Sequence, residues 1–189
     1  MRLLKLFVAA STLISTGLQP LVATAQEAVV PDDSAVPLIE QLRDSSPERA
    51  ETLADQVRRE WSASGSATAD YLLTRGRKAM ERDDPHAAVE HFTAVIDHAP
   101  EFAQGWAERA RAYYDLELYG PALGDLEHVL ALNPNHFEAI MGLAVILDSM
   151  NRAEDAYEAY RQVEAIHPHQ PGLTEALQRL EPMVRGSDL

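Results

Sequence analysis

Cysteine is absent from this chain of 189 residues. The absence excludes a disulfide framework, a thiolate zinc site, a cysteine nucleophile and a bacterial lipid anchor attached through cysteine. Glycine and proline are also sparse, at 9 and 11 residues, which excludes a collagen-like or low-complexity chain. Hydrophobic residues make up 46% of the sequence, too many for a disordered chain, so we expect one globular domain with a real core.

Basic side chains are few: 16 stand against 30 acidic ones, for a formal net charge of −14. Phosphate groups would be repelled by such a chain. We therefore expect no binding to nucleic acid and no nonspecific binding to anionic membranes.

The first 25 residues have the features of a cleaved export signal. Arg2 and Lys5 precede an apolar run over residues 6–18, and small residues follow at positions −3 and −1 of a cleavage site. The run is shorter than the roughly 20 apolar residues that a spanning helix needs. We predict cleavage between Ala25 and Gln26, a mature form without a membrane span, and a periplasmic or secreted location.

A period of 34 residues organises the chain from residue 69 onward. A fixed period of this length indicates tandem units that bury their apolar sides against one another. Five columns recur in three successive units: Gly76/Ala110/Ala144, Ala88/Ala122/Ala156, Phe92/Leu126/Tyr160, Val95/Val129/Val163 and Pro100/Pro134/Pro168.

Each unit is predicted to form two helices. In the first unit, Leu72, Gly76 and Ala79 form the apolar stripe of one helix. Asp84 and Pro85 suit the N-cap and the first position of the next. The sequence has no alternating apolar and polar run of strand length, so we expect an all-α fold.

The columns are similar to those of the tetratricopeptide repeat (TPR). In the second unit, Trp106, Ala110, Tyr113, Ala122 and Pro134 stand at the fourth, eighth, eleventh, twentieth and thirty-second positions of that repeat. The resemblance implies a right-handed α-solenoid of stacked helix-turn-helix TPR units with helical caps, as in short exported TPR proteins of Gram-negative bacteria. The three units are 69–102, 103–136 and 137–170.

Residues 26–37 are polar and are predicted to form a flexible leader. Residues 38–68 are predicted to form an N-terminal helical cap or a degenerate fourth repeat. The second alternative places Ala54 and Trp61 in repeat columns, whereas Arg58 then falls in the column of bulky apolar residues.

At the other end, residues 171–182 are predicted to form a capping helix with Leu173 and Leu177 on its apolar face. Pro182 is expected to end this helix. Residues 183–189 are then a tail.

No constellation of residues supports catalysis. The seven histidines lack the spacing of a zinc-binding helix, and we interpret them as exposed surface residues. The sequence Ser64-Gly65-Ser66 resembles part of a nucleophile elbow but lacks the flanking strand, so we interpret it as a hinge and a helix cap. We predict no catalytic residue, no metal site and no cofactor.

The TPR resemblance also implies a concave groove lined by the first helix of each unit. Arg77 and Arg111 form a stripe in it that leads to an apolar patch, and arginine can grip a carboxylate through two parallel hydrogen bonds. Alternatively, both arginines pair with local acids such as Glu81, Glu108 and Asp115. The candidate partner-binding residues are Leu73, Arg77, Met80, Gln104, Arg111, Tyr114, Met141 and Val145.

One subclass of the family binds chaperones through a carboxylate clamp that needs lysine and asparagine at defined positions. Leu73, Ala107 and Met141 stand at the fifth position here. We therefore do not expect that specificity.

The sequence thus predicts a non-catalytic periplasmic TPR protein that mediates protein–protein interaction and binds an unidentified peptide or partner helix in its groove. One alternative is a structural subunit of a cell-envelope assembly that contacts its partners through the convex face or the caps. Another alternative, which no residue cluster supports, is a histidine-based metal-binding protein.

Overall fold

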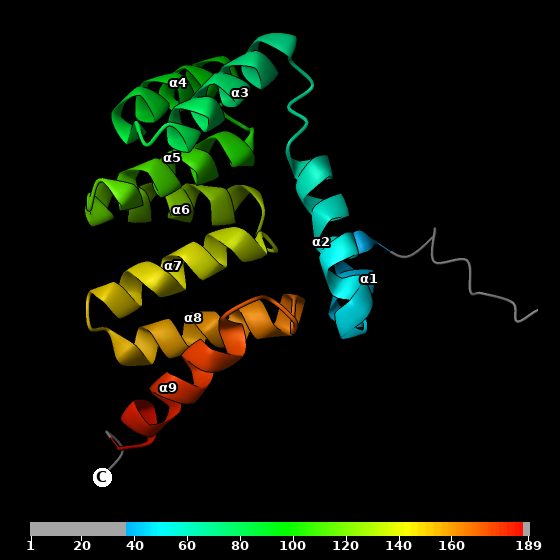
Figure 1. Cartoon of the computed structure of the whole chain (residues 1–189), viewed down its shortest axis with the longest axis vertical. Coiled ribbons are helices and arrows are strands. Elements are labelled where there is room, and N and C mark those ends of the chain that lie inside the picture. The colour runs from blue at the N-terminus through cyan, green and yellow to red at the C-terminus, as the bar shows by residue number, and fades with distance from the viewer. Residues whose placement is uncertain (1–36, 187–189) are drawn as a thin grey trace, which may run out of the picture. The chain divides into compact units, whose positions relative to one another are not determined.

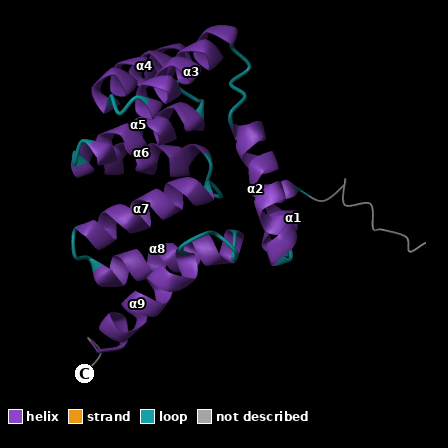
Figure 2. Ribbon diagram, in the orientation of Figure 1, coloured by secondary structure: helices purple, strands orange, loops and turns teal. Residues whose placement is uncertain are grey.

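A computed structural model describes residues 37–186 of the chain. Within that range there are nine helices and no strand, so the all-α prediction is confirmed (Figure 2). The predicted export signal and nearly all of the leader lie outside the described residues, as do residues 187–189. The helices are α1 (Leu38–Arg43), α2 (Pro47–Trp61), α3 (Ala67–Glu81), α4 (Pro85–His98), α5 (Ala103–Asp115), α6 (Tyr119–Leu132), α7 (Phe137–Ser149), α8 (Ala153–Ile166) and α9 (Leu173–Gly186).

Helices α3 to α8 form three antiparallel pairs that stack one upon the next (Figure 1). Each pair falls within one of the three units read from the sequence. Within a unit the two helices pack together, and the second helix of one unit also packs against the first helix of the next. This arrangement confirms the predicted TPR solenoid.

The repeated apolar columns form the core of the stack. Every member of the alanine column and of the valine column is fully buried, and Phe92, Leu126 and Tyr160 are at most 4% exposed. Gly76 shows why the small column is needed: a Cβ atom there would lie 2.3 Å from Cε1 of Phe92. The bulky residue of the second helix therefore fills the space that the small residue leaves.

The turn between the two helices of each unit has the same backbone in all three units. Asp83, Glu117 and Asn151 have φ values of 59°, 59° and 58°, in the left-handed region. The residue after each donates its N–H to the carbonyl five residues earlier, at 2.9–3.0 Å, which closes the helix end. The period thus extends to the turns, where no glycine marks it.

Residues 38–68 are predicted to form an N-terminal helical cap or a degenerate fourth repeat. Helices α1 and α2 of this segment, called the α1–α2 hairpin below, pack against α7 and α8. Leu42, Leu53 and Val57 share a core cluster with Phe137 and Ile166. A bulky apolar residue would be needed in the column where α2 carries Arg58, so α2 cannot build the core of a fourth unit.

At the C-terminus, α9 packs on α8 through Leu173, Leu177 and Leu180 and covers the last unit. The helix continues to Gly186, beyond the end predicted at Pro182. Proline inside a helix removes one hydrogen bond and crowds the carbonyl four residues earlier, yet α9 continues past Pro182.

Candidate partner-binding cavity

A cavity of about 410 Å³ lies along the first helices of the three units. We call it the α3–α5–α7 cavity, because those helices supply most of its lining. One wall comes from the end of α2, through Arg58 and Ser62. The apolar part of the lining is made by Ala107, Ala110, Leu126, Ala139, Met141, Gly142, Val145 and Ile146.

Most of the residues predicted from the sequence come together here. Six of the eight candidates line the cavity: Arg77, Gln104, Arg111, Tyr114, Met141 and Val145. Leu73 does not, because it is buried in the core cluster that includes Phe92 and Ala112. Met80 is partly buried against the same core cluster and also lies outside the lining.

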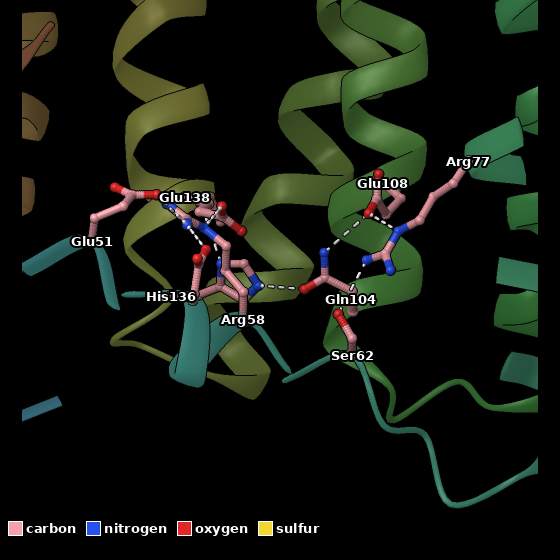
Figure 3. A network of polar contacts seen from close by, with 10 residues as sticks. Glu51, Arg58, Ser62, Arg77, Gln104, Glu108, His136 and Glu138 are labelled. Atoms are coloured by element: carbon pink, nitrogen blue, oxygen red, sulfur yellow. Dashed lines mark hydrogen bonds and ion pairs between the residues drawn. The ribbon is translucent and has the colours of Figure 1, made fainter. Parts of the chain in front are cut away.

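Arg77 is held by a chain of polar contacts along one side of the cavity (Figure 3). Its Nε donates to Oε1 of Glu108 at 2.6 Å, and a second guanidinium nitrogen donates to Oγ of Ser62 at 3.2 Å. Gln104 Nε2 donates to the same Glu108 oxygen at 3.3 Å. For Arg77, the alternative of internal pairing with a local acid is therefore the one that the structure shows.

The network continues to His136, which caps α7. Its Nδ1 accepts the N–H of Ala139 at 3.2 Å, so the ring hydrogen of the neutral imidazole is on Nε2, which lies 3.3 Å from Oε1 of Gln104. The side chain is fully buried, and Trp61 of α2 stacks on it with a centroid distance of 4.3 Å. Burial lowers the pKa of His136 to about 4.

His167 is the second fully buried histidine. Its ring meets the ring of Phe137 edge-on, with the centroids 5.2 Å apart, and neither ring nitrogen has a hydrogen-bond partner among the described residues. Burial lowers its pKa to about 4, and the positive charge of Arg58 acts in the same direction. For His136 and His167, the interpretation of the histidines as exposed surface residues was wrong.

For His136, though not for His167, the repeat pattern contains a sign that the side chain is buried. His136 stands 34 residues after Phe102, in a column that precedes the first helix of a unit, so it replaces an aromatic residue. His167 stands in the column of Ala99 and Asn133 and carries no such signal.

Arg58 of α2 bridges two parts of the chain. Its Nε donates to Oε1 of Glu138 on α7 at 2.9 Å, and another guanidinium nitrogen contacts Glu51 and Asp55 on α2 at 3.1 and 2.6 Å. Its guanidinium also lies over the ring of Phe137, 5.9 Å from the centroid. These contacts neutralise Arg58 where it enters the cavity wall.

Arg111 differs from the other two arginines of the lining. It is exposed, and no hydrogen bond or ion pair joins it to another described residue. The charged lining consists of Arg58, Arg77, Arg111, Glu108 and Glu138, so the cavity has a net charge of +1 in a chain of net charge −14. Arg111 is therefore the positively charged side chain of the lining that is available to bind an anionic group.

Within residues 37–186, the histidine and carboxylate side chains do not gather into a group that could hold a metal ion. In the same range, no helix has the length and apolar character needed to cross a membrane.

Comparison with known sequences gives the family. Models described as "Tetratricopeptide repeat" match residues 73–126 and 117–180. A TPR repeat-containing protein of Rhizobium etli is 30% identical over 145 residues, which cover 77% of this chain and 71% of that protein. The small glutamine-rich tetratricopeptide repeat-containing protein 2 of Saccharomyces cerevisiae is 32% identical over 117 residues, but the chain spans only 33% of its length.

Solved structures share the fold. The first TPR of Spaghetti (RPAP3), bound to the HSP90 peptide SRMEEVD, superposes with a TM-score of 0.61 at 22% identity and covers 64% of this chain and 95% of that one. MamA superposes with a TM-score of 0.58 at 19% identity and covers 78% of this chain and 85% of that one. The stacked helix pairs, the matching family models and the Rhizobium relative agree: the chain belongs to the tetratricopeptide repeat family, whose domains serve protein–protein interaction.

Proposed function

We propose that this chain is a non-catalytic, exported TPR protein that binds a peptide or partner helix in the α3–α5–α7 cavity. The observation that carries the proposal is the unpaired guanidinium of Arg111 beside an apolar lining. Support comes from RPAP3, whose first TPR is bound to an acidic peptide. That relative shares the fold at low identity, so its own partner is not transferred to this chain.

The lining favours one kind of ligand chemistry. Arg111 can take a carboxylate in a charge-assisted hydrogen bond, and the adjacent Tyr114, Met141 and Val145 can cover an aliphatic side chain. Arg77 is already engaged by Glu108, so the ligand carboxylate belongs at Arg111. A segment with an acidic residue, or a C-terminal carboxylate, next to an aliphatic residue meets both requirements.

A peptide array tests this proposal. Peptides that place Asp or Glu beside Leu, Val or Met are screened against the purified mature chain, and the tightest is measured by fluorescence anisotropy. Arg111→Glu should weaken binding by at least about 10-fold, since it turns an attraction into a repulsion. Arg75→Glu makes the same change at an exposed arginine of α3 outside the cavity and should leave the affinity within about 3-fold of wild type.

Equal affinities of the Arg111→Glu and Arg75→Glu variants would reject the cavity as the binding surface. In that case, contacts through the opposite face or the terminal helices, as in a subunit of an envelope assembly, would be the better account.

Export is the other part of the proposal, and it rests on Arg2, Lys5, the apolar run over residues 6–18 and the small residues that follow. Expression of the full chain in a Gram-negative host tests it. The periplasmic fraction should contain a protein whose first residue is Gln26. Retention of Met1 on a cytoplasmic product would contradict it.

A further inference from the structure

The α3–α5–α7 cavity is built from two parts of the chain that lie far apart in sequence. Its floor belongs to the repeat array, whereas Arg58 belongs to the end of α2 and Ser62 directly follows that helix. Residues 62–66 connect α2 to α3, and Gly65 in this connection has a φ of 75°, a conformation open to glycine at little cost. A short connection next to the cavity therefore joins this wall to the repeat array.

Beside the apolar core that it shares with α7 and α8, the α1–α2 hairpin is joined to the array by a few aromatic and polar contacts. Trp61 stacks on His136 and lies 5.3 Å from the Phe137 ring, measured between centroids. Arg58 pairs with Glu138, as described above. At the far end of the hairpin, Arg43 donates to the carbonyl of Ala165 at 3.0 Å.

The docked arrangement also carries a cost. His167 is fully buried with both ring nitrogens unpartnered, near Arg58 and Glu51 of α2, and Oε1 of Gln170 is likewise buried without a hydrogen-bond partner among the described residues. Buried polar groups of this kind lose their hydration without compensation. Because Arg58 and Glu51 of α2 lie near His167, undocking of the hairpin would open this ring to water, so the cost of burying it opposes docking.

Docking changes the electrostatics of the cavity. With the hairpin in place, Arg58 neutralises Glu138, and Ser62 fixes one nitrogen of Arg77. Without it, the lining would lose one positive charge and become neutral, and Glu138 would face an incoming carboxylate unpaired. An acidic ligand therefore meets a more favourable site when the hairpin is docked.

We propose that the α1–α2 hairpin is a movable wall whose docking completes the cavity, so that docking and the binding of an acidic segment stabilise each other. The inference rests on the proposed function, since it concerns the same cavity. Two events that favour the same conformation must promote each other by the same factor. If the docked hairpin instead blocked the cavity, docking and ligand binding would weaken each other.

Trp61 offers the sharpest test, because it docks the hairpin without lining the cavity. Trp61→Ala should raise the amide hydrogen exchange of residues 47–61 and weaken the tightest peptide of the array by about 10-fold. Trp61→Phe retains an aromatic ring against His136 and should restore both toward wild type. In the wild-type chain, the peptide should slow exchange in the same residues.

A charge swap provides a second, independent variant. Arg58→Glu should release the hairpin and weaken the peptide, and adding Glu138→Arg should restore docking and affinity together, because the lining keeps its net charge. Arg59→Glu, at the exposed neighbour on α2, is the control and should change neither. Circular dichroism on each variant confirms that the array is folded.

The outcomes separate the two proposals. If no peptide of the array binds the wild-type chain, the proposed function fails. If peptides bind but the Trp61→Ala variant binds them equally well or more tightly while its hairpin exchanges faster, the movable wall is wrong and the cavity function stands. A docked charge swap that still binds weakly would show direct contact by Arg58 and would likewise overturn the wall.

Discussion

The indole of Trp61 stacks on the imidazole of His136 at a centroid distance of 4.3 Å and thereby joins α2 to the N-cap of α7. This contact buries a titratable ring between the hairpin and the repeat array. His167 is also fully buried, edge-on to Phe137 of the core that the hairpin shares. The stability of the protein should consequently depend on pH in a range where surface histidines have little effect.

We expect stability to fall as the pH drops from 6.5 toward 4. The pKa of His136 and of His167 falls from 6.5 to about 4 on folding, so the unfolded chain takes up protons first. Above pH 6.5 neither ring lowers the stability of the folded chain, because it is neutral in both states. At pH 5 each ring lowers the free energy of unfolding by about 2 kcal/mol. Urea unfolding at pH 7 and pH 5 measures the loss.

Variants identify the source of that pH dependence, since carboxylates also contribute to acid destabilisation. His167→Leu should reduce the difference between the two pH values, and it removes the ring that lies near Glu51, Arg58 and His169. His86→Gln, at an exposed position of α4, should leave the difference between the two pH values unchanged. An unchanged difference in His167→Leu would show that this imidazole is already charged in the folded state.

Gly76 should be intolerant of alanine. The added Cβ would lie 2.3 Å from the Phe92 ring, and such overpacking costs about 1–3 kcal/mol. Gly124, on the exposed side of α6, has no atom within 4 Å of an added Cβ, so Gly124→Ala should stabilise by about 1 kcal/mol. Thermal unfolding of the two variants should move in opposite directions.

The second unit shows which change could relieve the clash of Gly76→Ala with Phe92. It has alanine and leucine, Ala110 and Leu126, in the two columns where the first unit has glycine and phenylalanine. Adding Phe92→Leu to Gly76→Ala should recover part of the lost stability. If the double variant were as unstable as the sum of both single changes, steric fit between these columns would not be the reason for glycine.

Glu117 should accept glycine without loss. Its φ of 59° costs a residue with a Cβ atom about 1–2 kcal/mol, and glycine avoids that cost. Glu117→Gly should therefore leave the midpoint of urea unfolding unchanged or raise it. Glu127→Gly makes the same replacement inside α6 and should lower stability by about 1 kcal/mol. A lower midpoint for Glu117→Gly would contradict the left-handed turn.

Arg109 and Asp125 should behave as one unit. Nε and a terminal guanidinium nitrogen of Arg109 each donate to a different Asp125 oxygen at 2.8 Å, and Asp125 is 5% exposed. Arg109→Met leaves a buried carboxylate without its partner, which should cost about 3–5 kcal/mol. The double variant with Asp125→Leu should regain most of it, as chemical denaturation would show. A small loss in Arg109→Met would mean that water reaches Asp125.

The repeat was readable from sequence because every unit solves the same packing problem. Phe92, Leu126 and Tyr160 occupy equivalent places, so their spacing places the helices of the array. The resemblance to the TPR family supplied the positions of most of the cavity lining. Leu73 was misplaced because a family position does not reveal that this side chain is buried in the core here.

Contacts outside the period could not be read in this way. Arg58 meets Glu138 and Trp61 meets His136 across long sequence separations, and neither pair repeats. Arg109 and Arg111 stand two residues apart in the same pattern, yet one is bound to Asp125 and the other is free. Only the three-dimensional neighbours decide which of two such arginines can receive a ligand.

The most direct test of the central claim is an NMR titration of the isotopically labelled mature chain with the tightest peptide of the array. The cavity account predicts that the largest amide shifts occur on α5 and α7, around Arg111, Tyr114, Met141 and Val145, and that they vanish in Arg111→Glu. Shifts confined to the second helices, α4, α6 and α8, would contradict it.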